Sequence, residues 1–179
     1  MIAVGIIVAI LIIVIIYVIS VSNSLNKSLV KIDEASSGID VALTKRYDVL
    51  TKMIDAVKGY SKHEQETLFK TVELRKNMTI QEKNTVNEAM NENLSKIYAL
   101  AESYPELKSS ENYKVLQQSI VDVEEHLQAS RRLYNANVSS FNQKIVTFPV
   151  SIIATSKCLA KKDFFIADEK KREDVKINL

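Results

Sequence analysis

The fold is decided by residues 25–57, which read LNKSLVKIDEASSGIDVALTKRYDVLTKMIDAV. Apolar side chains recur there in steps of three and four, the spacing that places them on one face of an α-helix. This pattern predicts a long amphipathic helix over residues 24–77 that packs against other helices. The predicted face comprises Leu25, Leu29, Ile32, Ser36, Ile39, Leu43, Arg46, Leu50, Met53, Val57, Tyr60, Glu64, Thr67 and Thr71.

Residues that break helices are scarce in this chain. It holds three glycines and two prolines in 179 residues, fewer than the average usage of about 7% and 5% would give. Because tight turns depend on glycine and proline, the composition favours a few long helices over a sandwich or barrel. The first helix either continues unbroken or breaks near Asp48 or Gly59, so three or four long helices are expected.

Residues 2–19, on the N-terminal side, are almost wholly apolar and read IAVGIIVAILIIVIIYVI. As a helix they would span about 27 Å, close to the bilayer core of about 30 Å. A cleaved signal peptide is the alternative. It is disfavoured because no Lys or Arg precedes the run and because Ser20–Ser24 lacks an A-x-A-like site. We predict a single-pass membrane anchor, with Lys27 and Lys31 favouring a cytoplasmic body.

Two further helices follow on the C-terminal side. Thr79–Glu82 matches a capping box and predicts that a second helix begins near Thr79. Pro105 disfavours helical geometry at Tyr104 and predicts the end of that helix. Its predicted apolar face comprises Ile80, Val86, Met90, Leu94, Ile97, Ala101 and Tyr104. A third helix is expected from about Ser110 to Phe148, where Pro149 breaks it.

The sequence therefore predicts an all-α protein. An N-terminal transmembrane helix is followed by an elongated antiparallel bundle of three to four long helices. Residues 1–20 form the anchor, 21–160 the helical bundle and 161–179 a C-terminal tail. Two states are open for the tail, which either docks across the bundle or remains mobile.

Two stretches resemble the signatures of the LemA family. The first holds Arg46-Tyr47-Asp48, Val57-Lys58-Gly59-Tyr60 and His63-Glu64-Gln65-Glu66-Thr67-Leu68. The second holds Arg131-Arg132-Leu133-Tyr134-Asn135, Val138, Phe141-Asn142, Ile145 and Phe148-Pro149. The resemblance implies a bacterial membrane protein with a helical-bundle body and no established enzymatic activity. Some relatives are associated with building or organising membrane compartments. The chain departs from the family at Thr51, where a proline is usual, and near Asp174, where the usual late proline is missing.

Several polar residues fall close to the predicted helix faces. Buried polar pairs can fix the register of packed helices, so we predict that several of these residues form an interhelical network of salt bridges and hydrogen bonds. The alternative is that each is a solvated residue on a helix surface. The set comprises Arg46, Asp48, Lys58, His63, Glu64, Glu124, Arg131, Arg132, Tyr134, Asn135 and Asn142.

No catalytic or metal-binding pattern is complete. His63-Glu64 begins an H-E-x-x-H motif, but Thr67 stands at the second histidine position. The Glu-x-x-His pairs of di-iron bundles also fail, because Tyr60 and Val123 lie three residues before the two histidines. Cys158 lies in no recognisable motif. We therefore predict no metal, no cofactor and no enzymatic activity.

The net charge of +2 comes from interspersed acidic and basic residues, which disfavours a nucleic-acid-binding domain. The leading hypothesis is a membrane-anchored scaffold or interaction protein with protein partners or self-association. One alternative is an enzymatic or metal-binding helical bundle. Another is a protein that senses or organises lipid surfaces, whose tail lies on the membrane.

Overall fold

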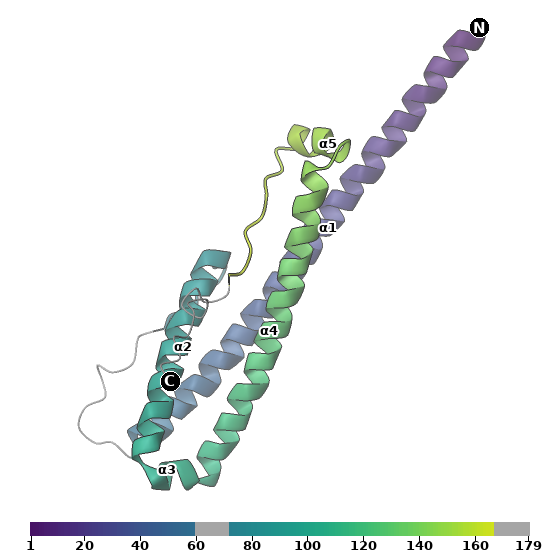
Figure 1. Cartoon of the computed structure of the whole chain (residues 1–179). Coiled ribbons are helices and arrows are strands. Elements are labelled where there is room, and N and C mark those ends of the chain that lie inside the picture. Colours follow the sequence, from purple (N-terminus) through teal and green to yellow (C-terminus); the bar gives the residue numbers. More distant parts are fainter. Residues whose placement is uncertain (60–71, 167–179) are drawn as a thin grey trace, which may run out of the picture. The chain divides into compact units, whose positions relative to one another are not determined.

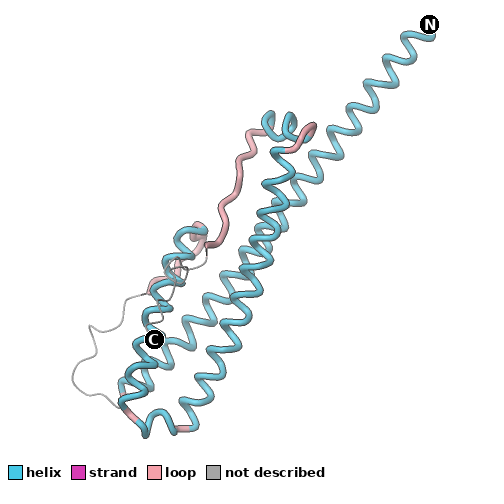
Figure 2. Tube along the Cα trace, viewed as in Figure 1, coloured by secondary structure: helices cyan, strands magenta, loops and turns pink. Residues whose placement is uncertain are grey.

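The computed structural model describes residues 1–59 and 72–166. Within these residues it contains five helices and no strand, which confirms the all-α prediction with an apolar N-terminal helix (Figures 1 and 2). The helices are α1 (Ile2–Lys58), α2 (Ile80–Ser103), α3 (Pro105–Ser109), α4 (Glu111–Val146) and α5 (Val150–Ser156).

The chain divides into two compact units, and both α1 and α4 contribute to each of them. Unit 1 comprises residues 1–36 and 133–164. Unit 2 comprises the described residues of 37–132 and 165–179. The two units are described separately below.

Unit 1 pairs the first part of α1 with the last part of α4 in antiparallel directions. The Asn137 side-chain amide donates a hydrogen bond to the Lys31 carbonyl at 3.0 Å. Further along α4, the Lys144 ammonium donates to the Ser28 hydroxyl, which lies earlier in α1, at 2.9 Å. Residues after Lys144 therefore lie on the side of the apolar residues 2–19. The buried core of unit 1 comprises Leu25, Ile32, Ala35, Tyr134, Val138, Phe141, Ile145 and Ala154.

Unit 2 packs three helix segments around a buried core. They are the later part of α1, α2 and the first part of α4, and Figure 1 shows α3 at the turn between α2 and α4. Burial of apolar side chains is the main stabilising term for such a bundle. The buried apolar residues comprise Ile39, Ala42, Leu43, Leu50, Met53, Val57, Met90, Ile97, Ala101, Leu107, Tyr113, Ile120, Val123, Leu127 and Phe165.

The predicted ends of the second and third helices agree with the structure to within a few residues. The Thr79 hydroxyl accepts from the Glu82 amide at 3.2 Å. The Glu82 carboxylate in turn accepts from the Thr79 amide at 2.7 Å, which completes the capping box. α2 ends one residue before Tyr104. Pro105 begins α3, which the sequence reasoning did not predict; proline is favoured at this first helical position.

The first helix differs from its prediction at both ends. It begins at Ile2, so the apolar segment and the first bundle helix are one helix. It runs unbroken through Asp48 and ends at Lys58, whereas residues 72–79 are not helical. Gly59, a weak helix former, directly follows the last helical residue. The residues of the predicted apolar face between 60 and 71 lie outside the described residues.

The buried face of α1 is also rotated slightly from its prediction. Ser28, Ala35 and Ala42 are buried, whereas Leu29 and Ser36 are only half-buried. The small side chains of Ser28, Ala35 and Ala42 allow neighbouring helices to approach closely, because interhelical distances depend on the side chains at the contact.

Candidate functional site

Arg46 is the polar centre of unit 2. Its side chain is 1% exposed, on the buried face of α1. One guanidinium nitrogen, Nη1, donates to the Asn87 side-chain oxygen at 2.6 Å and to the Asn87 carbonyl at 3.2 Å. The other, Nη2, donates to the Asn91 side-chain oxygen at 2.7 Å and forms an ion pair with Glu124. Arg46 therefore joins α1 to α2 and to α4.

This environment decides how the buried charge is tolerated. Burial lowers the pKa of the Arg46 guanidinium below its ordinary value, and the charge and hydrogen bond of Glu124 oppose that shift. A buried charge is costly unless it is paired and hydrogen-bonded. Arg46 meets both conditions, so the arrangement disfavours any sliding of α1 that would separate it from its partners.

Sequence reasoning missed a second polar contact on the same face of α2. Lys83 is buried, and its ammonium lies 2.7 Å from a carboxylate oxygen of Asp40 in α1. Asn87 and Asn93 are buried as well, while the predicted Val86 and Leu94 are half-buried. Residues 83, 87, 90, 97 and 101 follow one another at intervals of three, four or seven positions and form this face. A search for apolar residue types alone does not find its polar members.

The C-terminal segment after α5 is held by two more of the predicted residues, within unit 1. The Tyr134 hydroxyl donates to the Asp163 carbonyl at 3.0 Å. The Asn142 amide donates to the Lys162 carbonyl at 2.9 Å and accepts from the Lys162 amide at 2.8 Å. An asparagine that pairs with both backbone groups of one residue fixes that residue against α4.

Arg131 makes a comparable contact within unit 2. Its guanidinium lies 4.5 Å from the ring centroid of buried Phe165. It also donates to the Ile166 carbonyl at 3.1 Å. A guanidinium over an aromatic face adds a cation–π attraction to this hydrogen bond. Residues 165 and 166, within the predicted tail of 161–179, therefore contact α4.

The other predicted residues differ in exposure. Asp48, Lys58 and Arg132 are exposed, and Asn135 is half-buried on α4. His63 and Glu64 lie outside the described residues. The structure thus brings Arg46 and Glu124 together, and it places Arg131, Tyr134 and Asn142 against the C-terminal segment. The interhelical network as a whole stays a prediction.

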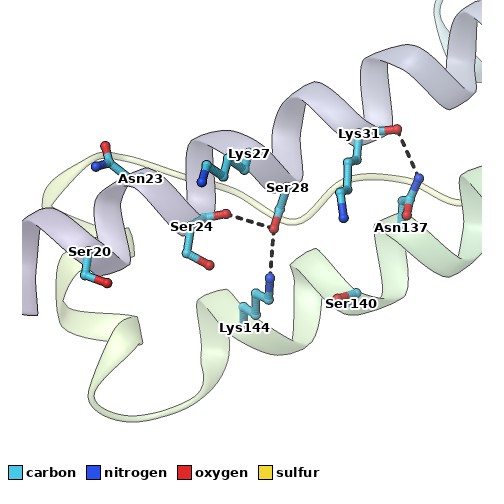
Figure 3. Close-up of a pocket in the computed structure, with 9 residues that line it drawn as sticks. All are labelled: Ser20, Asn23, Ser24, Lys27, Ser28, Lys31, Asn137, Ser140 and Lys144. Carbon is cyan, nitrogen blue, oxygen red and sulfur yellow. Dashed lines mark hydrogen bonds between the residues drawn. The ribbon is translucent and has the colours of Figure 1, made fainter.

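A polar groove of about 490 Å³ lies in unit 1 between α1 and α4 (Figure 3). Three lysines contribute to it, and hydroxyl and amide side chains supply the rest of its lining. The lining residues are Ser20, Asn23, Ser24, Lys27, Ser28, Lys31, Asn137, Ser140 and Lys144.

A metal site and a reactive thiol are two other chemistries to consider within residues 1–59 and 72–166. No three His, Cys, Asp or Glu side chains in these ranges form a group that could hold a metal ion. Cys158 is exposed, and its backbone has a positive φ of 53°.

Comparisons with known proteins identify similar chains. Residues 35–179 match the model of the LemA family. The chain is 34% identical over 158 residues to Protein LemA of Metamycoplasma hominis, covering 86% of this chain and 72% of that protein. It is 29% identical over 72 residues to Magnetosome protein MamQ of Magnetospirillum gryphiswaldense, covering 40% of this chain and 26% of that protein. Magnetosome protein MamQ 2 of Paramagnetospirillum magneticum is 30% identical over 72 residues, covering 40% of this chain and 26% of that protein.

Proposed function

The chain belongs to the LemA family, and on that premise we propose that it is a membrane-anchored scaffold of the bacterial cell envelope. Its body faces the cytoplasm and binds other proteins or further copies of itself. LemA is not a known enzyme family, and membership together with one candidate membrane span fits a membrane-associated, non-catalytic protein.

The observation that carries this proposal is the continuity of α1. One helix runs from Ile2 to Lys58, so the candidate span continues directly into the packed body. All side chains of residues 2–19 are exposed in the folded chain. Exposed apolar surface is costly in water, at about 25 cal/mol per Å², and the bilayer removes that cost.

The polar contacts of unit 2 support a binding role. In unit 2, Arg46 and Lys83 of different helices bind partners on neighbouring helices, and these contacts favour the observed alignment. A fixed alignment holds the outer faces of the helices in a constant arrangement, and constant faces are what a protein partner can recognise.

The basic residues near the span support the cytoplasmic orientation. Lys27 and Lys31 follow Ile19, the last apolar residue of the span, within 12 positions. Positive charges this close to a span favour the cytoplasmic side.

Crosslinking mass spectrometry on intact cells tests the scaffold role and the orientation together. The cells carry the full chain with a C-terminal tag, and protease accessibility of the tag is scored on the same cells. Permeabilised cells serve as the positive control for cleavage. The expected result is a protected tag with reproducible crosslinks from the body to a protein partner or to a second copy. A tag cleaved in intact cells would reverse the orientation, and crosslinks confined to single chains would reject the scaffold.

A further inference from the structure

We propose that the groove of unit 1 binds the phosphate group of an anionic phospholipid. The inference depends on α1 spanning the bilayer and not on the scaffold role. Figure 3 shows the side chains of Lys31 and Lys144 pointing into the space between the two helix segments, with Lys27 beside it.

The charge of the groove is the first argument. Lys27, Lys31 and Lys144 line it, and no acidic residue does. Within residues 1–59 and 72–166, no carboxylate forms an ion pair with any of these three lysines. Such a concave, positively charged surface attracts an anion.

The donors in the groove suit phosphate in particular. The half-buried Lys144 ammonium donates one hydrogen bond, to the Ser28 hydroxyl. An ammonium has three donors, so two stay available as far as the described residues are concerned. Hydroxyl and amide groups of Ser24, Asn23 and Ser140 line the same space. Phosphate has several acceptor oxygens, and charge-assisted hydrogen bonds to them are about twice as strong as neutral ones.

The position of the groove points to a lipid as the source of the phosphate. Ser20 and Asn23, at one end of its lining, lie one and four residues after Ile19 on the unbroken helix α1. The headgroup layer extends about 5–8 Å beyond the hydrocarbon core on each side. At 1.5 Å per residue, Ser20–Ser24 fall within that layer, and the Lys27 backbone lies about 12 Å beyond the hydrocarbon core. Long helical side chains lean toward the helix N-terminus, so the Lys27 stem leans toward the bilayer.

Exposed apolar side chains on the same side of unit 1 support this choice. Residues after Lys144 lie toward the span, because α4 runs antiparallel to α1. There Phe148 is 77% exposed and Ile152 is 63% exposed. Apolar side chains at this depth can enter the boundary between headgroups and acyl chains. These apolar side chains would not strengthen the binding of soluble phosphate, whereas they can strengthen contact with a lipid surface.

Native mass spectrometry of the full chain in detergent micelles tests the proposal. Phosphatidylglycerol is the anionic probe and phosphatidylcholine the zwitterionic control. The groove variant carries Lys27→Gln, Lys31→Gln and Lys144→Gln. The matched variant carries Lys45→Gln, Lys52→Gln and Lys108→Gln, three exposed lysines of unit 2. Both variants lose the same charge. A double variant, Lys27→Gln with Lys31→Gln, spares the Lys144 hydrogen bond in case the triple variant misfolds.

We expect wild-type chain and matched variant to retain phosphatidylglycerol in preference to phosphatidylcholine. Juxtamembrane lysines contribute about a factor of five each. The groove variant should therefore bind phosphatidylglycerol about 100-fold more weakly, and the double variant roughly 25-fold more weakly. Equal retention by all variants would overturn the proposal. Titration with inorganic phosphate separates the sources, because binding of the free anion as tight as that of the lipid would overturn the lipid assignment.

Discussion

Arg46 of α1 and Glu124 of α4 form an ion pair inside unit 2, in which the arginine is fully buried and the glutamate is half-buried. The two residues are far apart in sequence, and the same guanidinium also binds Asn87 and Asn91 of α2. One side chain therefore satisfies polar groups on two neighbouring helices. Its loss would remove the partner that Arg46 gives to each of these groups.

Replacing Arg46 should destabilise the body strongly. Removing one partner of a buried ion pair typically costs about 3–5 kcal/mol, because the other charge stays buried and unpaired. We expect Arg46→Met to lower the free energy of unfolding by about that amount. Guanidinium denaturation of the full chain in detergent micelles, followed by circular dichroism, measures it. The double variant Arg46→Met with Glu124→Leu should recover part of the loss, because no charge is then left unpaired.

The control for this experiment is Arg75→Met. Arg75 also pairs with a carboxylate, that of Glu73, but both side chains are largely exposed. Exposed pairs contribute little to stability, so the denaturation midpoint should not change measurably. Equal midpoints for the Arg46 and Arg75 variants would show that the buried contact does not stabilise unit 2.

The capping box of α2 should respond to acid. Hydrogen bonds from the backbone amide and then the hydroxyl of Thr79 hold the pKa of the Glu82 carboxyl below its ordinary 4.5. Because the folded pKa is depressed, the stabilisation is present above pH 4.5 and is lost as the pH falls through the folded value. Carbon-13 NMR of the glutamate carboxyls, titrated in the full chain, reads this pKa directly.

Thr79→Ala should raise the Glu82 pKa partway toward 4.5, because the hydroxyl bond is lost and the backbone bond remains. Thr85→Ala is the matched control, since the Thr85 hydroxyl binds the Gln81 carbonyl within α2. A Glu82 carboxyl that already titrates at 4.5 in the wild-type chain would contradict the capping box.

Gly38 offers a stabilising substitution in unit 2. A Cβ at this position would lie 3.6 Å from the Ser130 hydroxyl oxygen, an ordinary van der Waals contact. Alanine is favoured over glycine inside a helix by about 0.5–1 kcal/mol, so Gly38→Ala should raise the free energy of unfolding by that amount. Gly38→Leu should lower it by about 1–3 kcal/mol, because a larger side chain must displace Ser130. Denaturation midpoints in the opposite order would disprove this account of the contact.

Asn142 should control how tightly the C-terminal segment of unit 1 is held. Its two hydrogen bonds to the Lys162 backbone contribute about 0.5–1.5 kcal/mol each. Asn142→Ala should therefore speed hydrogen exchange of the Lys162 amide by roughly 10-fold or more. Gln143→Ala serves as the control, because Gln143 is exposed and its amide contacts Ser139 of the same helix. Unchanged exchange at Lys162 in the Asn142 variant would count against this role.

Local patterns in the sequence predict much of this fold. The steps of three and four residues predict α1 and α4, and the box at Thr79 with Pro105 predicts the limits of α2. These signals succeed because capping and helical periodicity depend on residues within about one turn of each other.

The polar contacts are harder to predict because they join distant residues. Arg46 meets Asn87 across 41 positions, and buried Lys83 pairs with Asp40 of another helix. No local pattern reveals such a distant partner. The sequence therefore predicted Val86 and Leu94 on the buried face of α2, where Asn87 and Asn93 are buried instead. The end of α1 at Lys58 is a similar case, since the periodic spacing predicts a helix to residue 77, whereas residues 72–79 are not helical.

The unbroken helix between span and body has a consequence for rotational phase. Each residue turns an α-helix by about 100° and lengthens it by about 1.5 Å. One alanine inserted after Ser20 would therefore swing the lysine groove about 100° around the helix axis relative to the embedded segment, while raising it hardly at all. Seven inserted residues would complete nearly two turns and restore the facing. Along this helix, the sequence length between span and groove sets a direction as well as a distance.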